Sequence, residues 1–267
     1  MHKKRDVILD QNLLPNQTAN LKMIISQEQK EFFIACKKND VTNFKKLIQN
    51  KNVSVRAADS KGMSCLNLAC SKENEEMIKI LLEFDSQLIN ISDENGVFPI
   101  EWIVKIGNVS LFNLLLEKGA DFSVNKNTFS LLHLATYNGN IKIVESLLKL
   151  GFNINLKDDN KRTPLTWAAE VGDLTILKFL ISNGANVHLS DEEGFTAMDT
   201  AVGEGHFLIV KELILKGVDV NQRTQNNGTV LHTAVAWERA EIIKLLLDNG
   251  AKKDIKDADG KTPFQYQ

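Results

Sequence analysis

An internal repeat with a period of about 33 residues constrains this chain more than any other feature of its sequence. Apolar anchor residues recur at eight positions in similar local contexts: Phe32, Leu66, Ile100, Leu132, Leu165, Met198, Leu231 and Phe264. The intervals between them are 34, 34 and 32 residues, followed by four intervals of 33. Such regularity is typical of a solenoid, in which each unit packs only against its neighbours. All 267 residues can therefore belong to one elongated structure.

The segment 158–186 shows what is repeated. Thr163 and Pro164 predict the start of a short helix, because a hydroxyl can cap free amide groups and proline has no N–H to leave unpaired there. Gly172 can end this helix and Gly184 can end a second one. Apolar residues between these points give each helix one apolar face. The segment therefore predicts a pair of short helices that must bury these faces against neighbouring pairs.

The start of the repeat unit resembles a known family. It reads Thr-Pro-Leu-Thr-Trp-Ala at 163–168 and Thr-Val-Leu-His-Thr-Ala at 229–234, and this pattern resembles the ankyrin family from residue 26 to the C-terminus. The resemblance implies an all-α solenoid of stacked helix-turn-helix units with β-turn fingers, with about seven full repeats and a partial one at the C-terminal end. Residues 26–267 would form this repeat domain. We expect residues 1–25 to be an N-terminal extension that caps the solenoid or binds a partner.

The second repeat differs from the others at its two corners. Glu73 and Asp85 stand where most repeats have glycine. Glycine adopts left-handed backbone conformations at little cost, and other residues do so less readily. We therefore expect both corners to be looser or differently shaped.

Composition argues against several classes of function. A formal net charge of −2 gives no overall electrostatic attraction for nucleic acid or a membrane. The sequence shows neither an apolar run of about 20 residues nor a secretory signal, so we expect a cytoplasmic protein. Cys36, Cys65 and Cys70 form no Cys-x-x-Cys pair and are expected to be buried, reduced thiols. We expect a monomer without metal or cofactor.

No set of residues in the sequence indicates catalysis. His133 and His232 occupy the histidine position of the repeat motif, where the resemblance implies bonds to backbone in the turn. The acidic groups at 158–159 and 191–193 lie 33 residues apart, which indicates a repeated surface rather than a general acid and base. The motifs of phosphate-binding loops, nucleophile elbows and zinc proteases are absent from the sequence. We therefore expect no enzymatic activity in this chain.

Binding residues are expected on the concave face. In ankyrin proteins this face is lined by the turn tips and the exposed side of each first helix, and several such positions here are apolar or aromatic without an obvious structural need. The candidate protein-binding residues are Phe129, Tyr137, Asp159, Arg162, Glu170, Val171, Glu193, Phe195, Glu204 and Trp237. The alternative for Phe129, Phe195 and Trp237 is that they pack on the neighbouring turn.

Charge on this face is expected to change along the array. The basic candidates lie in the second to fourth repeats: Lys61, Lys72, Lys105 and Lys126. The acidic candidates lie in the fifth and sixth repeats: Asp159, Glu170, Glu192, Glu193, Asp199 and Glu204. The alternative is a solvated surface without function, since exposed charge pairs contribute little to stability.

These observations lead to three functional hypotheses. The first is a non-catalytic interaction module or scaffold that binds a protein partner on its concave face. The second adds that the Asn-, Lys- and Ile-rich composition resembles effectors that intracellular bacteria deliver into the host cytosol. The third is that the chain, which stops three residues after Phe264, recruits substrates for a catalytic region of a longer enzyme, outside this chain.

Overall fold

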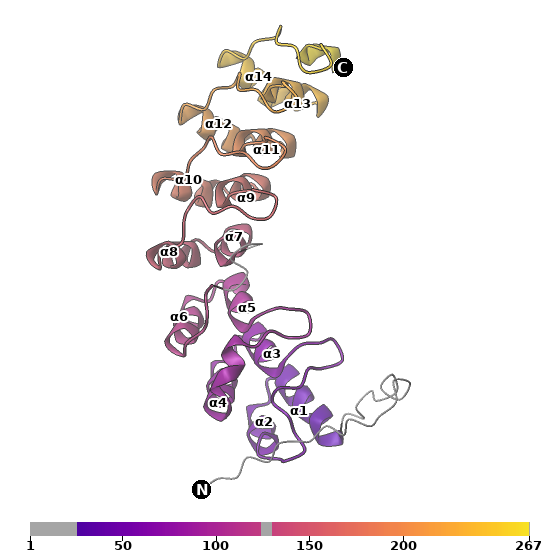
Figure 1. Ribbon diagram of the computed structural model, residues 1–267, viewed down its shortest axis with the longest axis vertical. Helices are drawn as coiled ribbons and strands as arrows, with labels where there is room; N and C mark the ends of the chain where they lie inside the picture. Colours follow the sequence, from indigo (N-terminus) through magenta and orange to yellow (C-terminus); the bar gives the residue numbers. More distant parts are fainter. Residues whose placement is uncertain (1–25, 124–129, 267) are drawn as a thin grey trace, which may run out of the picture.

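The computed structural model describes residues 26–123 and 130–266. Within these ranges the chain forms helix pairs that stack into an elongated array of two rows, with the odd-numbered helices in one row and the even-numbered helices in the other (Figure 1). The array curves toward the side of the odd-numbered helices, from which the loops between pairs also project. The predicted all-α solenoid is confirmed.

The helices are short and alternate regularly along the chain. The first helices of the pairs are α1 (Gln27–Lys37), α3 (Cys65–Ser71), α5 (Pro99–Ile106), α7 (Leu131–Tyr137), α9 (Pro164–Val171), α11 (Ala197–Glu204) and α13 (Val230–Ala236). The second helices are α2 (Val41–Leu47), α4 (Glu75–Phe84), α6 (Val109–Glu117), α8 (Ile141–Lys149), α10 (Leu174–Ser182), α12 (Phe207–Leu215) and α14 (Ala240–Asp248). Two short 3-10 helices, η1 (Ser86–Asn90) and η2 (Pro263–Tyr266), complete the described part.

The first helices begin where the sequence predicts. Thr163 accepts a hydrogen bond from the N–H of Thr166 at 3.3 Å, and Pro164 is the first residue of α9. Ser64 caps α3 in the same way, through the N–H of Asn67 at 3.0 Å. Each cap pairs an amide that the helix itself leaves free. The cap therefore fixes the point at which each finger turns into a helix.

The corner between the helices of a pair is alike in repeats with and without glycine. Gly172 has a left-handed backbone with φ 82°, and Glu73 adopts the same conformation with φ 52°. The next N–H then bonds back into the first helix in both repeats, from Asp173 to the carbonyl of Ala168 at 3.1 Å and from Asn74 to that of Ala69 at 3.0 Å. The expectation of a different corner at Glu73 was wrong, because the hydrogen bond and helix packing hold a non-glycine residue in this conformation.

The corner at Asp85 is different, as expected. Asp85 has an extended backbone, and its carboxylate accepts the N–H of Gln87 at 3.1 Å to begin η1. Arg56 also donates to this carboxylate at 2.6 Å. The anchors Leu66 and Ile100 are 34 residues apart, one more than the usual 33, and this extra residue is accommodated in the 3-10 turn.

One apolar core runs along the array between the two rows of helices. The anchor residues of successive first helices are almost completely buried, as are the matching residues of the second helices. Because each layer packs on the next, stability depends on neighbouring pairs rather than on any single pair.

Side chains at the start of second helices add polar bonds between consecutive pairs. Asn140 Nδ2 donates to the carbonyl of Val104 at 2.7 Å, and Arg239 Nη2 donates to that of Gly203 at 2.7 Å. His206 Nε2 lies 3.0 Å from the carbonyl oxygen of Glu170. Each bond satisfies a carbonyl at the end of a first helix in the preceding pair.

The loops between pairs form a row of fingers. Most of the described fingers begin with an aspartate that closes them, as Asp158 does by accepting the N–H of Arg162 at 2.8 Å. Backbone bonds link adjacent fingers, for example from Glu192 N–H to the carbonyl of Asn160 at 3.1 Å. We call the side made by the fingers and the first helices the finger face; it is the expected concave face.

Candidate protein-binding surface

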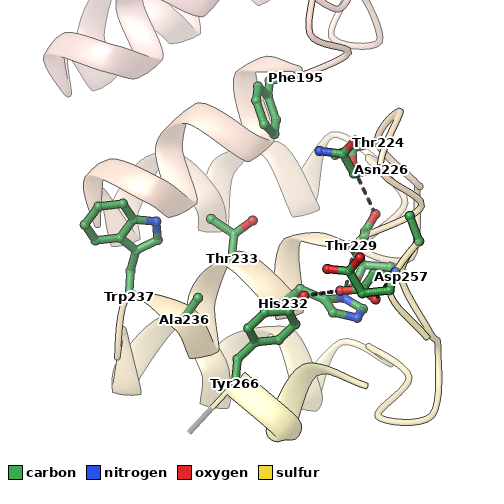
Figure 2. Close-up of a pocket in the computed structure, with 13 residues that line it drawn as sticks. Phe195, Thr224, Asn226, Thr229, His232, Thr233, Ala236, Trp237, Asp257 and Tyr266 are labelled. Atoms are coloured by element: carbon green, nitrogen blue, oxygen red, sulfur yellow. Dashed lines mark hydrogen bonds between the residues drawn. The ribbon is translucent and has the colours of Figure 1, made fainter. Parts of the chain in front are cut away.

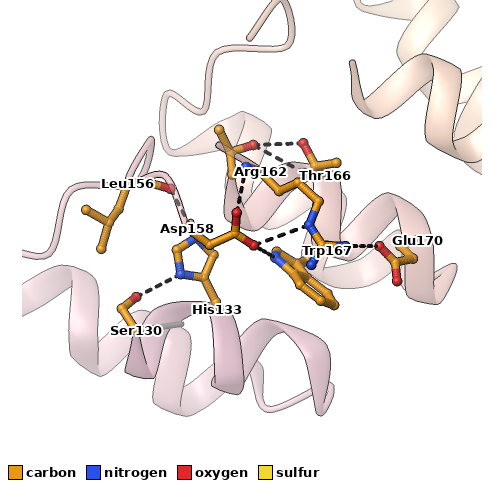
Figure 3. A network of polar contacts seen from close by, with 9 residues as sticks. Ser130, His133, Leu156, Asp158, Arg162, Thr166, Trp167 and Glu170 are labelled. Carbon is orange, nitrogen blue, oxygen red and sulfur yellow. Dashed lines mark hydrogen bonds and ion pairs between the residues drawn. The ribbon is translucent and has the colours of Figure 1, made fainter. Parts of the chain in front are cut away.

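Two candidate residues of the fifth repeat, Arg162 and Glu170, are held in one network, shown in Figure 3. The guanidinium carbon of Arg162 lies 3.7 Å from the centre of the Trp167 ring. Arg162 Nη1 lies 3.0 Å from a carboxylate oxygen of Glu170, and Arg162 Nε lies 3.3 Å from one of Asp158. Trp167 Nε1 donates to the same oxygen of Asp158 at 2.9 Å. The network fixes Arg162 against the finger face instead of leaving it free in solvent.

Tyr137 extends this network toward the fourth repeat. Its ring meets Trp167 edge to face, with the ring centres 5.5 Å apart. Tyr137 is 48% exposed, whereas Trp167 is 9% exposed. Trp167 therefore packs as the buried platform under two candidate contact residues.

A buried histidine lies on the other side of Asp158. Ser130 Oγ is 3.0 Å from His133 Nδ1, and the carbonyl oxygen of Leu156 is 3.1 Å from His133 Nε2. Burial lowers the pKa of His133 below its usual 6.5, an effect that the nearby Asp158 carboxylate partly opposes. The expected bond to the turn backbone is confirmed, and the ring has a structural role.

A second group of candidates lines a hollow of ≈ 520 Å³ at the C-terminal end of the finger face (Figure 2). Phe195 and Trp237 lie on its border, together with Tyr266 of η2. Trp237 is 64% exposed, which is unusual for so large an apolar side chain. Tyr266 was not among the predicted residues, although it stands two residues after an anchor, as Trp167 does.

The remaining candidates lie outside these two groups. Val171 at the end of α9 is 41% exposed. Asp159, Glu193 and Glu204 are also exposed, on fingers and at the end of α11. Phe129 lies outside the described residues. Phe195 is half-buried, which fits both alternatives considered for it.

The charge gradient is present in part. Lys61, Lys72 and Lys105 are exposed in the second and third repeats, and Lys126 lies outside the described residues. Of the acids, Asp159, Glu192, Glu193 and Glu204 are exposed and Glu170 is half-buried. The inclusion of Asp199 was wrong.

Asp199 is buried because it caps a helix. Its Oδ2 accepts the N–H of Thr196 at 2.8 Å and the Thr196 hydroxyl at 2.7 Å, at the start of α11. Burial raises the pKa of Asp199 above its usual 3.8, and the two Thr196 bonds oppose this shift. The side chain therefore belongs to the scaffold rather than to the surface.

The cysteines are buried free thiols, with the sulfur atoms of Cys36 and Cys65 3.5 Å apart. Burial raises the pKa of Cys70, so this thiol is unreactive at neutral pH. Residues 26–123 and 130–266 contain no group of three His, Cys, Asp or Glu side chains that could hold a metal ion. Of the helices in these ranges, none is both long and apolar enough to cross a lipid bilayer.

Comparison with known proteins gives matches over most of the chain. The family model described as ankyrin repeats (3 copies) matches residues 32–128, 132–224 and 201–266. A fowlpox virus protein described as an ankyrin repeat protein, FPV034, is 38% identical over 66 residues. Palmitoyltransferase AKR1 of Lachancea kluyveri is 40% identical over 76 residues. These two segments cover 25% and 27% of this chain but only 15% and 10% of the relatives.

Proposed function

Since the chain belongs to the ankyrin-repeat family, whose repeats are generally protein-interaction modules, we propose that it binds a protein partner along its finger face without catalysing a reaction. The surface would extend from Tyr137 in the fourth repeat to Trp237 in the seventh. It includes the Arg162 network and the hollow beside Phe195.

The exposure of Trp237 is the single observation that carries this proposal. A tryptophan that is 64% exposed beside a hollow leaves apolar area in water that a partner could cover. Covering one large apolar side chain contributes roughly 1.5 to 3 kcal/mol, and tryptophan and tyrosine are frequent among the residues that dominate binding energy. Tyr137, 48% exposed, offers a second such side chain on the same face.

Charge on the finger face supports a partner with a basic segment. Asp159, Glu193 and Glu204 are exposed in the fifth and sixth repeats. Acidic side chains around an apolar centre steer a basic partner toward the surface and disfavour acidic ones. The acidic fifth and sixth repeats would therefore lie beside the most basic part of the partner.

Affinity capture with matched variants tests the proposal. Three proteins would each be incubated with cell lysate. The first is the parent chain, and the second is a finger-face variant with Phe195→Glu and Trp237→Ala. The third is an outer-face variant with Leu208→Ala and Leu215→Ala, on the row of even-numbered helices. Leu208 and Leu215 lie on α12 and are 60% and 72% exposed, so they match Trp237, at 64%, in accessibility. Quantitative mass spectrometry compares the retained proteins.

We expect a partner that the parent and the outer-face variant retain equally and that the finger-face variant loses. Thermal melts would establish that all three chains are folded. A partner that is lost only with the α12 substitutions would contradict the finger face as the binding surface.

One observation favours the alternative that the chain recruits substrates for an enzyme. The matched segment of palmitoyltransferase AKR1 shows that a similar segment occurs in a protein named as an enzyme. This hypothesis predicts that the native reading frame continues past Gln267 into a catalytic region, and a stop codon directly after Gln267 would count against it. Delivery into a host cytosol stays a prediction from composition, for which a translocation assay with a C-terminal reporter is the test.

A further inference from the structure

The Arg162 network has a counterpart at the C-terminal end of the chain. Asp257, Lys261 and Tyr266 occupy the same repeat positions as Asp158, Arg162 and Trp167, each 99 residues further along. The residues at these equivalent positions also make equivalent contacts. The Tyr266 hydroxyl donates to Asp257 Oδ2, as Trp167 Nε1 donates to Asp158 Oδ2. The ammonium of Lys261 lies 4.8 Å from the centre of the Tyr266 ring. The chain thus builds the same arrangement twice, with a cation over an aromatic ring beside a carboxylate.

The repeat before this counterpart lacks the arrangement. At the positions of Asp158, Arg162, Trp167 and Glu170 it has Thr224, Gly228, Thr233 and Ala236. All four of these small residues line the hollow. The hollow therefore lies where the seventh repeat lacks the carboxylate, guanidinium and indole of the fifth.

Gly228 can carry a side chain without a clash at its Cβ atom. A Cβ atom placed on Gly228 would have no neighbour closer than 3.7 Å, and its backbone is not left-handed. The volume of ≈ 520 Å³ falls within the range of about 300 to 1,000 Å³ typical of ligand pockets. A side chain supplied by another molecule can thus occupy the space that this chain leaves empty.

We propose that this hollow receives an arginine side chain of a protein partner, stacked on the aromatic ring of Trp237 and paired with the carboxylates of Asp257 and Asp259. The inference rests on the proposed function, because it names the contact that a bound partner would make at this end of the finger face.

The lining of the hollow fits a guanidinium group. Asp257 and Asp259 are its only charged residues among those described, and both are negative. Phe195 and Trp237 supply aromatic faces, on which a planar cation is stabilised by the ring quadrupole, whereas Lys261 already lies over the ring of Tyr266. Arginine suits such a site better than lysine, because its guanidinium can stack and donate several hydrogen bonds at once.

The carboxylate of Asp257 has room for a further donor. Its Oδ1 accepts the N–H groups of Asp259 and Lys261, both at 3.0 Å, and its Oδ2 accepts the Tyr266 hydroxyl. An ionised carboxylate offers about four acceptor sites. In the fifth repeat the same oxygen of Asp158 accepts from both an indole and a guanidinium, so one oxygen can serve an aromatic donor and a cation together.

Titration of the isotope-labelled full chain with a short peptide tests the proposal by NMR. The probe is acetyl-Gly-Gly-Arg-Gly-Gly-amide, and the same peptide with citrulline, which is neutral but of nearly the same shape, is the control. The three tryptophans give three indole N–H signals, which single Trp→Phe substitutions assign. Trp167 serves as an internal reference, because Arg162 already covers its ring.

We expect the arginine peptide to shift the Trp237 indole signal saturably while the Trp167 signal stays in place. The citrulline peptide should bind about tenfold more weakly or not at all, because it lacks the charge that strengthens the hydrogen bonds to carboxylates. Asp259→Asn should weaken binding of the arginine peptide by a similar factor.

A second variant fills the hollow from within. Gly228→Arg with Thr233→Trp supplies the guanidinium and the indole of the fifth repeat and should abolish the response of Trp237. Equal binding of the citrulline peptide, an unchanged response in the filled variant, or no shift with the arginine peptide would each overturn the inference. If the filled variant does not fold, Asp259→Asn still tests the inference: unchanged binding of the arginine peptide by this variant would overturn it.

The two proposals fail differently. Loss of a partner with Phe195→Glu and Trp237→Ala, together with no response to the arginine peptide, would keep the finger face as the binding surface and remove the arginine site. Retention of every partner by that variant would remove the finger face itself.

Discussion

The guanidinium of Arg162 lies against the face of Trp167, with 3.7 Å between the guanidinium carbon and the ring centre. The side chain of Arg162 is only 23% exposed and is paired with Asp158 and Glu170. An arginine held in this way loses little further conformational freedom when a partner binds. The stack thus makes the fifth repeat a rigid part of the finger face, and it contributes to the stability of the fold.

Arg162→Ala should lower the free energy of unfolding by roughly 2 kcal/mol, because it removes the stack and leaves the Asp158 carboxylate, 5% exposed, without its cation. Arg162→Lys keeps the charge but loses the planar stack, so a smaller loss is expected. Urea unfolding measures both, with Asp159→Ala at the exposed neighbouring position as the control. Equal stability of the parent and Arg162→Ala would show that the network does not stabilise the fold.

Gly172→Ala should be more destabilising than Gly184→Ala. Both glycines are left-handed, with φ 82° and 91°, so an alanine at either position costs about 1 to 2 kcal/mol in backbone strain. Only at Gly172 would the new Cβ lie 2.6 Å from a ring atom of His206, whose Nε2 bonds to the carbonyl of Glu170. Thermal melts of the two variants compare the effects, and equal losses would mean that the contact between Gly172 and His206 is unimportant.

Asp199→Asn should stabilise the protein at neutral pH by about 1 kcal/mol, because it keeps an acceptor for the Thr196 cap and adds a donor. Asn67, at the equivalent position of the second repeat, makes such a donor bond: its Nδ2 donates to the carbonyl of Val97 in the next finger at 2.8 Å.

The dependence on pH checks the cause of this effect. Because the pKa of Asp199 is raised in the folded state above its usual 3.8, the aspartate favours folding when protonated and disfavours it as pH rises through that window. The advantage of the asparagine should therefore shrink as pH falls toward about 4. Melting temperatures of the parent and of Asp199→Asn between neutral pH and about pH 4 measure this effect. A variant that is less stable than the parent at neutral pH would refute the assignment of Asp199 as a buried carboxylate that destabilises the fold when ionised.

Acid should destabilise the protein partly through His133. Burial holds the pKa of His133 below the usual 6.5, so the unfolded chain takes up a proton before the folded one does. The stability that this histidine contributes is complete above pH 6.5. It is lost as the pH falls from 6.5 toward the lowered pKa of the folded state. His133→Asn should reduce this loss, which urea unfolding at about pH 7.5 and 5.5 would reveal. An identical pH dependence in the two proteins would exclude this role.

Much of the fold could be predicted from the sequence because a solenoid repeats one helix-turn-helix unit with the same local contacts. The cap at Thr163, the corner at Gly172 and the buried anchor Leu165 each depend on neighbours within one or two repeats, so a period in the sequence implies a period in space. The corner at Glu73 was mispredicted because propensity alone favours glycine there, whereas packing of the two helices forces the left-handed conformation on a glutamate.

The binding surface was less predictable because exposure depends on how neighbouring side chains meet. Arg162 was predicted as a protein-binding residue, but the sequence did not indicate that its guanidinium lies over Trp167, five residues later in the chain. Asp199 was assigned to the surface on its charge, yet its short side chain folds back onto Thr196. Tyr266 was missed because it follows the last anchor, although comparison with Trp167 at the equivalent position would have identified it.

Site-specific photo-cross-linking tests most directly whether the finger face binds a protein. The full chain would carry a photoreactive benzoylphenylalanine in place of Trp237, which is 64% exposed on the finger face, or in place of Leu215, which is 72% exposed on the outer row. After irradiation in cells, we predict a discrete protein adduct with the residue at position 237 and none with the residue at position 215. An adduct that forms only from position 215 would contradict the account.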